Sequence, residues 1–345
     1  MKNDLWNYLK STGKPIVLYG MGNGADKIIR VLESRGIPFK GVFASDEFVR
    51  EKTFHGFKVT NYSALKEQFG DMIVLLCFGS ARWEVLENIK KISASEELYA
   101  PDVPVYGDIL FDLDYAKRNA DDLKTVYDML YDEQSKLTFE NTVKYKISGD
   151  IKYLYDCEVL EDEPYESFLN LGKTEVFMDL GAYRGDTVRD FLSRVNSYDK
   201  IIAVEPDKKT FIKLCKECED LENTLLLNGC ISDADGKKAF NMDSSRGSAV
   251  GSGGTQIDCF SIDGILKGEK ATFIKMDIEG EEANAIKGAK DTILKHKPKM
   301  IISCYHRSED LIEIPKRVTE IRGDYKIYMR HFPSLPAWDT CFYFV

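Results

Sequence analysis

The sequence predicts an α/β protein with two domains, each built on a mainly parallel sheet, and a helical segment between them. Three observations support this prediction. A short β-type run is followed at once by a glycine turn and an amphipathic helix twice along the chain, at 16–36 and at 176–195. Such alternation is typical of a parallel sheet with helices on its faces. The chain closes with β-type runs at 325–329 and 340–345, which predict an antiparallel hairpin.

The first domain is predicted to cover residues 1–107, with β-type runs at 16–19, 39–44 and 72–78. Its first turn, from Gly20 to Ala25, matches G-x-G-x-x-A, a relaxed form of the fingerprint that lets a pyrophosphate approach a helix N-terminus. Asp46, 26 residues after Gly20, would then bind a ribose. Because such a turn can also simply close a helix against a strand, we predict a Rossmann-like fold here and leave a bound nucleotide open.

Residues 108–165 show apolar positions at helical spacing among many charges, which predicts one or two helices joining the domains. The second domain is predicted to cover 166–345. A stretch rich in Ser and Gly, 244–254, is predicted to be a loop. The strands are expected at 176–180, 201–204, 224–227, 272–276 and 299–303, and the helices at 188–195, 209–218, 281–295 and 309–321.

Charge and hydropathy exclude several classes of protein. The chain of 345 residues has 47 basic and 57 acidic side chains, a formal net charge of −10, and no basic block that could follow a phosphate backbone. Its longest apolar run, 72–78, is far shorter than the ~20 residues that span a bilayer. The polar, charged N-terminus does not resemble a signal peptide. We therefore expect a soluble cytoplasmic protein with neither nucleic acid nor a membrane as partner.

The eight cysteines are too few for a disulfide framework, and a cytoplasmic chain would keep them reduced. Cys215 and Cys218 form the one CxxC pair. A zinc site needs four ligands, so we interpret this pair as two thiols on one helix face and expect neither redox nor zinc chemistry from it.

Polar side chains stand where the strands of the second domain end. Because ligands of open α/β sheets bind beyond the carboxyl ends of the strands, these positions are the candidate site. The turn that follows Asp179 is longer than the dinucleotide fingerprint, and its backbone N–H groups suit an anionic or zwitterionic group. An acid 24 residues after Gly181 suits the two hydroxyls of a ribose. Together they fit a cofactor that carries a nucleoside. The strand-end residues are Asp179, Glu205, Asn228, Asp277 and the pair Tyr305-His306.

Residues 275–282, Lys-Met-Asp-Ile-Glu-Gly-Glu-Glu, followed by Gly288-Ala289, match the pattern K-x-D-x-E-G-x-E and G-A. With this segment and an antiparallel final strand, the second domain resembles the FkbM family of S-adenosylmethionine-dependent methyltransferases, which have the class I fold. Residues 305–311 and the pair at 330–331 also fit that family. The similarity covers about 150–345. The first domain resembles small Rossmann-like modules attached to sugar-modifying enzymes. We refer to residues 275–282 as the signature segment.

The resemblance implies a seven-stranded Rossmann-like sheet with S-adenosylmethionine as cofactor and a hydroxyl of a saccharide, glycoconjugate or natural product as acceptor. Asp179, Gly181 and Gly185 would hold the methionine end, Glu205 the ribose, and Asn228 and Ile231 the adenine. The same turn adds Tyr183, Arg184, Asp186 and Thr187 to the cofactor-binding residues, although Arg184 could also be solvated. The methyl group would meet the acceptor at Asp277, Glu279 and His306, with His306 or Asp277 as general base.

Several alternatives remain open. Asp277 could instead be the N-cap of the helix expected from 281. A metal shared by Asp277, Glu279 and His306 is conceivable, and we assign none. If Gly20–Asp46 were the working site, the protein would be a nucleotide-sugar oxidoreductase, although no Tyr-x-x-x-Lys relay is evident. A third hypothesis is a binding module that holds a cofactor without turnover.

Overall fold

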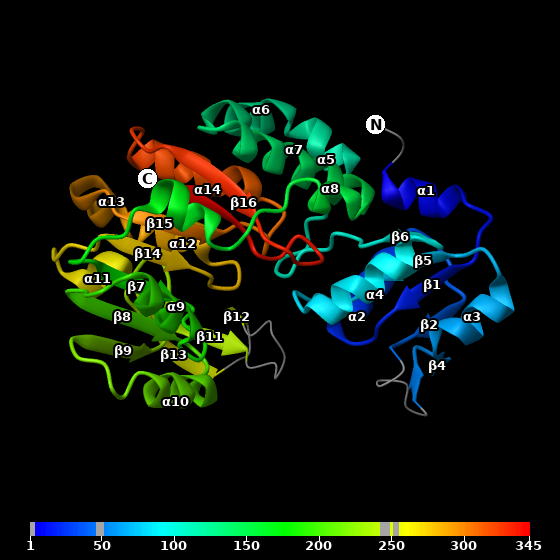
Figure 1. Ribbon diagram of the computed structural model, residues 1–345, viewed down its shortest axis with the longest axis horizontal. Helices are drawn as coiled ribbons and strands as arrows, with labels where there is room; N and C mark the ends of the chain where they lie inside the picture. Colours follow the sequence, from blue (N-terminus) through cyan, green and yellow to red (C-terminus); the bar gives the residue numbers. More distant parts are fainter. Residues whose placement is uncertain (1–3, 46–51, 242–248, 251–254) are drawn as a thin grey trace.

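The structure, a computed structural model, describes residues 4–45, 52–241, 249–250 and 255–345. Two sheets lie on opposite sides of the molecule, and the helices of residues 113–155 cross above the space between them (Figure 1). Within the described part of the chain, no helix combines the length and apolarity needed to cross a membrane.

The first sheet is built on the predicted runs at 16–19, 39–44 and 72–78, which form its three central strands. All its neighbouring strands are parallel except the hairpin at its edge. The edge strands are too short to leave a pattern in the sequence. In the order of the sheet the strands are β3 (Thr53–Phe54), β4 (Phe57–Thr60), β2 (Gly41–Phe43), β1 (Ile16–Tyr19), β5 (Ile73–Leu76) and β6 (Glu97–Tyr99), and the helices are α1 (Leu5–Ser11), α2 (Asn23–Ser34), α3 (Tyr62–Phe69) and α4 (Trp83–Ser93).

The second sheet confirms the predicted seven-stranded topology, because its last strand in sequence runs antiparallel to both neighbours. In the order of the sheet the strands are β16 (Ile327–His331), β17 (Thr340–Phe344), β15 (Lys299–Ser303), β14 (Phe273–Met276), β7 (Val176–Leu180), β8 (Lys200–Glu205) and β9 (Thr224–Asn228). Its helices are α9 (Asp186–Arg194), α10 (Lys208–Glu217), α11 (Ile262–Leu266), α12 (Glu282–Lys287), α13 (Lys290–His296) and α14 (Asp310–Ile321). The single helix expected over 281–295 is therefore wrong. It divides at Gly288, which packs so closely on the backbone of Ser232 that a Cβ would collide with it.

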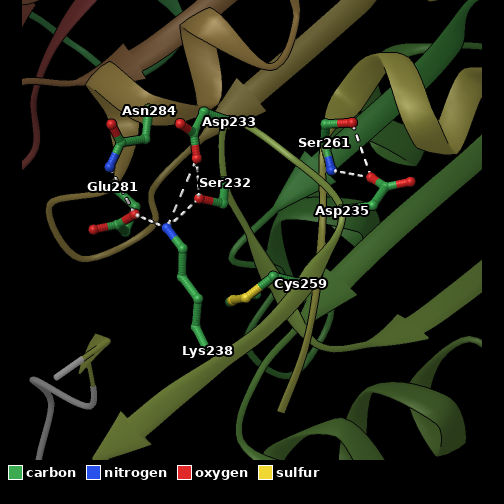
Figure 2. Close-up of a disulfide and its surroundings, with 9 residues drawn as sticks. Ser232, Asp233, Asp235, Lys238, Cys259, Ser261, Glu281 and Asn284 are labelled. Carbon is green, nitrogen blue, oxygen red and sulfur yellow. Dashed lines mark hydrogen bonds and ion pairs between the residues drawn. A yellow bond between two sulfur atoms is a disulfide. The ribbon is translucent and has the colours of Figure 1, made fainter. Parts of the chain in front are cut away.

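A small sheet beside β9 contains β10 (Cys230–Ile231), β13 (Thr255–Phe260), β11 (Gly236–Asn241) and β12 (Ala249–Val250) in that order. The expectation that all cysteines stay reduced is wrong here. Cys230 and Cys259 stand opposite each other on parallel strands, with Cα atoms 4.6 Å apart, and form a disulfide (Figure 2). Cys215 and Cys218 are free, as expected. The predicted loop 244–254 lies outside the described residues except for β12.

The region between 108 and 165 contains α5 (Leu113–Arg118), α6 (Ala120–Met129), α7 (Glu133–Ser148) and α8 (Lys152–Tyr155), followed by a π-helical turn at Tyr165–Leu169. Val126 and Phe139 join the same buried core as Ile302 and Phe342 of the second sheet. Arg330 on β16 is 1% exposed, and its guanidinium donates to Asp132, Ser135 and Glu163. The helical segment is therefore fixed to the second sheet by apolar packing and by a buried cation.

The loop between β16 and β17 contacts the first domain. Ser80, just after β5, exchanges two backbone hydrogen bonds with Leu335 at 2.7 and 3.0 Å. Trp338 lies so close to Gly79 that a Cβ at this glycine would collide with its ring. Leu335 and Ala337 are buried in the first domain's core together with Tyr145 of α7. The carboxyl ends of the first sheet therefore face the second domain.

Candidate functional site

The predicted cofactor turn lies between β7 and α9, as the sequence indicated. Gly181 and Gly185 have φ angles of 83° and 90°, a left-handed conformation that favours glycine. A Cβ at Gly181 would collide with the backbone oxygen of Asp277. The turn therefore lies directly against the signature segment, at the point where β7 and β14 end side by side.

Glu205 at the end of β8 is 7% exposed and holds the turn in place. Its carboxylate accepts hydrogen bonds from the backbone N–H groups of Tyr183 at 3.0 Å and Asp207 at 2.8 Å. Burial outweighs these two bonds and raises the pKa of Glu205 to about 7. A buried acid with lone pairs remaining beyond its two backbone bonds suits the hydroxyls of a ribose.

Asp179 supports a polar ligand at this position. It is completely buried, and within the described part of the chain neither carboxylate oxygen has a hydrogen-bond partner. The ammonium of Lys275 is 3.7 Å away, and burial outweighs its charge and raises the pKa of Asp179 to about 6. A buried carboxylate left without hydrogen bonds is costly unless a ligand supplies them. With the glycine cradle at Gly181, these groups fit the zwitterionic end of S-adenosylmethionine.

The other predicted cofactor residues differ in how exposed they are and in what they contact. The side chain of Asn228 donates to the backbone oxygen of Glu205 at 2.9 Å, whereas Ile231 is buried in the core and only 2% exposed. Tyr183 and Arg184 are exposed, with the guanidinium 4.9 Å from the ring centre. Asp186 and Thr187 begin α9. Ile231 therefore packs inside the protein and presents almost no surface to a bound adenine.

The three predicted catalytic residues come together at the ends of β14 and β15. With Glu282, Asp277, Glu279 and His306 form what we call the His306 cluster. His306 is 1% exposed, and its Nε2 lies 3.3 Å from Oδ1 of Asp277 and 3.8 Å from Oε2 of Glu279. Its Nδ1 lies 2.9 Å from Oε1 of Glu282, which is completely buried. Tyr305 donates its phenol to the same Oδ1 of Asp277 at 3.0 Å. The imidazole is therefore enclosed by carboxylates on both of its nitrogens.

These contacts set the charges of the cluster. Burial alone would lower the pKa of His306, but the charge of Glu282 at 2.9 Å, with those of Asp277 and Glu279, raises it to about 10. Burial would raise the pKa of Asp277, yet the positive charges of Lys275 and His306 hold it below the ordinary value. Burial raises the pKa of Glu279, against the pull of His306. At neutral pH His306 is therefore an imidazolium beside the ionised carboxylate of Asp277.

The signature segment is held by its neighbours rather than by a helix cap. The N-cap of α12 is Glu281, so the alternative that Asp277 caps this helix is wrong. Lys238 of β11 reaches Glu281 at 3.4 Å and also bonds Ser232 (Figure 2). Glu279 has a φ of 55°, a strained conformation for a residue with a side chain. The fold therefore maintains an unfavourable backbone at the point where the carboxylates project.

Three residues in or beside this cluster had no chemical role in the sequence analysis, although Tyr305 was among the strand-end residues of the candidate site. Glu282 ends the signature segment, Tyr305 precedes the predicted histidine, and Lys275 begins the segment. Only the fold reveals that all three contact Asp277 or His306. Asp277, Glu282 and His306 are also close enough together to hold a metal ion. Because Glu282 and Asp277 lie on different nitrogens of the ring, however, the arrangement fits shared protons better than one ion bound through one nitrogen.

The glycine turn of the first domain is explained by packing. A Cβ at Gly24 would collide with the backbone oxygen of Cys77 at the end of β5, so this glycine allows α2 to lie close to the sheet. Asp26 in the first turn of α2 is 2.7 Å from His55. Asp46, the residue expected to bind a ribose, lies outside the described residues. The dinucleotide hypothesis for this domain therefore stays a prediction.

Comparison with known proteins gives a sequence match in the second domain and a structural match over the whole chain. The sequence model described as "Methyltransferase FkbM domain" matches residues 179–323. These residues are similar to the FkbM methyltransferase domain family. The crystal structure of methyltransferase FkbM from Methylobacillus flagellatus KT aligns with 99% of this chain and 92% of its own, with a TM-score of 0.75 and 21% identity. The fold is therefore that of an FkbM methyltransferase over the whole chain, the first domain included.

Two other solved structures align with part of this chain. Fibrillarin from Aeropyrum pernix, crystallised with natively bound S-adenosyl-L-methionine, covers 52% of this chain and 71% of its own, with a TM-score of 0.34 and 16% identity. A precorrin-6y C5,15-methyltransferase from Geobacter metallireducens GS-15 covers 51% and 81%, with a TM-score of 0.33 and 10% identity. A search of curated proteins gave no match. The domain match supports a methyltransferase that uses S-adenosylmethionine.

Proposed function

We propose that this FkbM-type protein transfers the methyl group of S-adenosylmethionine to a hydroxyl oxygen of a saccharide, glycoconjugate or natural product. One observation carries the proposal. The turn suited to the methionine end of the cofactor touches the backbone of Asp277, whose carboxylate lies at the edge of the His306 cluster. Donor and acceptor groups would therefore meet at one point, and such positioning supplies much of the rate of a displacement reaction.

Bound S-adenosylmethionine would supply an electrophilic methyl group on a sulfonium. The chain's own residues would handle the proton of the acceptor hydroxyl, which must leave as the new C–O bond forms. Because the raised pKa of His306 keeps it protonated at neutral pH, Asp277 is better suited than His306 to accept that proton. Its side chain is 31% exposed and so within reach of an acceptor. His306 would donate a hydrogen bond to Asp277 and hold it in place.

The cofactor assignment can be tested by thermal unfolding with S-adenosylmethionine, NAD or a nucleotide-sugar in parallel. A ligand at 100 times its Kd stabilises the native state by about 2.7 kcal/mol, which shifts the midpoint by several degrees. We expect a shift with S-adenosylmethionine that is lost in Glu205→Ala and kept in Glu222→Ala, an exposed acid at the opposite edge of the sheet. A shift with NAD alone would contradict the proposal and favour the oxidoreductase alternative.

The acceptor class requires a second experiment. Purified protein with radiolabelled S-adenosylmethionine would be offered panels of saccharides and of hydroxylated natural products, and the methylated atom identified by mass spectrometry. We expect a methyl ether on oxygen, with turnover strongly reduced in Asp277→Asn and cofactor affinity retained. A product methylated on nitrogen or carbon would contradict the assignment of a hydroxyl acceptor. Cofactor binding with no product from either panel would favour the third hypothesis, a binding module.

A further inference from the structure

Lys27 of the first domain reaches toward the His306 cluster of the second domain. Lys27 lies in the second turn of α2 and is half-buried. Its ammonium donates to the backbone oxygen of Pro104 at 3.1 Å and to that of Val105. Burial lowers the pKa of Lys27, and the nearby charge of Glu279 opposes that change. The side chain thus joins α2 to the segment between β6 and α5 and is electrostatically coupled to the signature segment.

The segment that Lys27 holds, residues 104–107, is in turn bonded to the site. The backbone N–H of Tyr106 donates to the backbone oxygen of His306 at 2.8 Å. The guanidinium of Arg307 lies 4.2 Å from the centre of the Tyr106 ring. The same guanidinium donates to the backbone oxygen of Gly280 at 2.6 Å. Residues 104–107 therefore connect α2 to both chain segments that carry the His306 cluster, the signature segment and the segment that follows β15.

The packing at this connection leaves little freedom. A Cβ at Gly280 would lie 3.1 Å from the Cβ of Tyr106 and 3.0 Å from Nε of Arg307. Interior packing of this density transmits a displacement instead of absorbing it. If Lys27 lost its two carbonyl partners, residues 104–107 would lose their anchor on α2, and the backbone of His306 would lose a fixed donor.

We propose that Lys27 is a positioning residue for the methyl-transfer site, through which the first domain fixes the backbone of His306 and the signature segment. This inference rests on the proposed function only in calling that site the place of methyl transfer. Lys27 contacts neither donor nor acceptor in this scheme. It acts through residues 104–107, and its removal loosens His306 while the cofactor turn at Gly181 stays intact.

The chain has four histidines, so imidazole ¹⁵N spectra at a fixed pH can test the proposal without any acceptor. His306 reports on the site, and His55, 2.7 Å from Asp26 of α2, reports on that helix. Signals are assigned with His306→Gln and His55→Gln. The variants are Lys27→Met, Lys27→Arg as the conservative replacement, and Arg30→Met, an exposed cation on the same helix, as control.

In Lys27→Met we expect the ring signals of His306 to move while those of His55 stay, and the Tyr106 amide to exchange about ten-fold faster. Lys27→Arg should restore both, and Arg30→Met should change neither. The proposal is overturned if His306 and the Tyr106 amide are unaffected in Lys27→Met. It is equally overturned if His55 moves as well and the arginine does not restore the spectrum, since Lys27 would then only support α2.

Lys27→Gln, whose neutral amide keeps an N–H₂ donor group, is the milder variant if Lys27→Met does not fold, and the same criteria apply to it. The thermal shift with S-adenosylmethionine is measured on every variant and should be unchanged, because the cofactor turn is not part of the connection. If the wild-type protein shows no thermal shift with S-adenosylmethionine, the proposed function is contradicted, whereas the coupling between Lys27 and His306 is unaffected. The two failures are therefore distinguishable.

Discussion

The contact between Glu282 and His306 can be tested by replacing one atom, in Glu282→Gln. Both side chains are almost completely buried, with Oε1 and Nδ1 2.9 Å apart. The rise of the His306 pKa from its ordinary value of 6.5 to about 10 corresponds to about 5 kcal/mol in favour of the imidazolium. Glu282 is the largest of the groups that raise this pKa. Removing its charge should lower the pKa of His306 by about two units or more.

The same change should destabilise the protein in a pH-dependent way. A raised pKa in the folded state contributes stability that is fully present below about pH 6.5 and is lost as the pH rises through about 10. Glu282→Gln should therefore cost about 3 kcal/mol at pH 7, since it leaves a buried charge without its main partner, and less at pH 10. Glu313→Gln, which removes a half-exposed acid on α14, should cost under about 0.5 kcal/mol at either pH.

Two measurements decide this prediction. An NMR titration of the His306 ring gives its pKa in both proteins, and urea unfolding at pH 7 and pH 10 gives the free energy of unfolding. Asp310, whose pKa burial and the charge of Glu282 raise to about 7, will also titrate, so the imidazole signal is needed to isolate His306. A pKa that stays near 10 in Glu282→Gln, or a stability equal to that of Glu313→Gln, would refute the reasoning.

Three further outcomes are expected. Gly181→Ala, where a Cβ collides with the signature segment, should abolish the thermal shift with S-adenosylmethionine; a normal shift would show that the turn is not the cofactor site. Arg330→Met should lower the free energy of unfolding in urea by about 3–5 kcal/mol, because it leaves two partly buried carboxylates unpaired; a loss below 1 kcal/mol would contradict this. Cys230→Ser should cost about 3–4 kcal/mol under non-reducing conditions, since its bond to Cys259 closes a 29-residue separation, whereas Cys215→Ser should not.

Much of the second sheet, and which polar side chains meet at its carboxyl edge, could be predicted from where the β-type runs end. Asp277 and His306 follow β-type runs that neighbour each other in this topology, so their approach could be expected. The same reasoning placed Asp179 and Glu205. The role of Glu282 could not be predicted, because its contact with Nδ1 of His306 depends on the turn that the chain makes between β14 and α12.

Other features depend on register or on the arrangement of the domains. The disulfide requires Cys230 and Cys259 to stand opposite each other on parallel strands, and nothing in their spacing fixes that register. Lys27 was one charge among many on a helix of the first domain. Lys27 reaches residues 104–107 because α2 begins and β6 ends at the same edge of the first sheet. Those residues reach His306 because that edge faces the second domain. No periodic pattern encodes either placement.

The burial of Leu335 and Ala337 in the first domain's core affects how the protein is made. During synthesis the first domain leaves the ribosome long before Leu335 and Ala337 are made. The apolar surface that these two residues cover therefore stays exposed to solvent, or is bound by a chaperone, until the chain is complete. Closing a loop of that length is slow compared with local helix formation. A gene fragment that encodes only the first domain would yield an aggregating product, and calorimetry of the whole chain should record one cooperative transition instead of two.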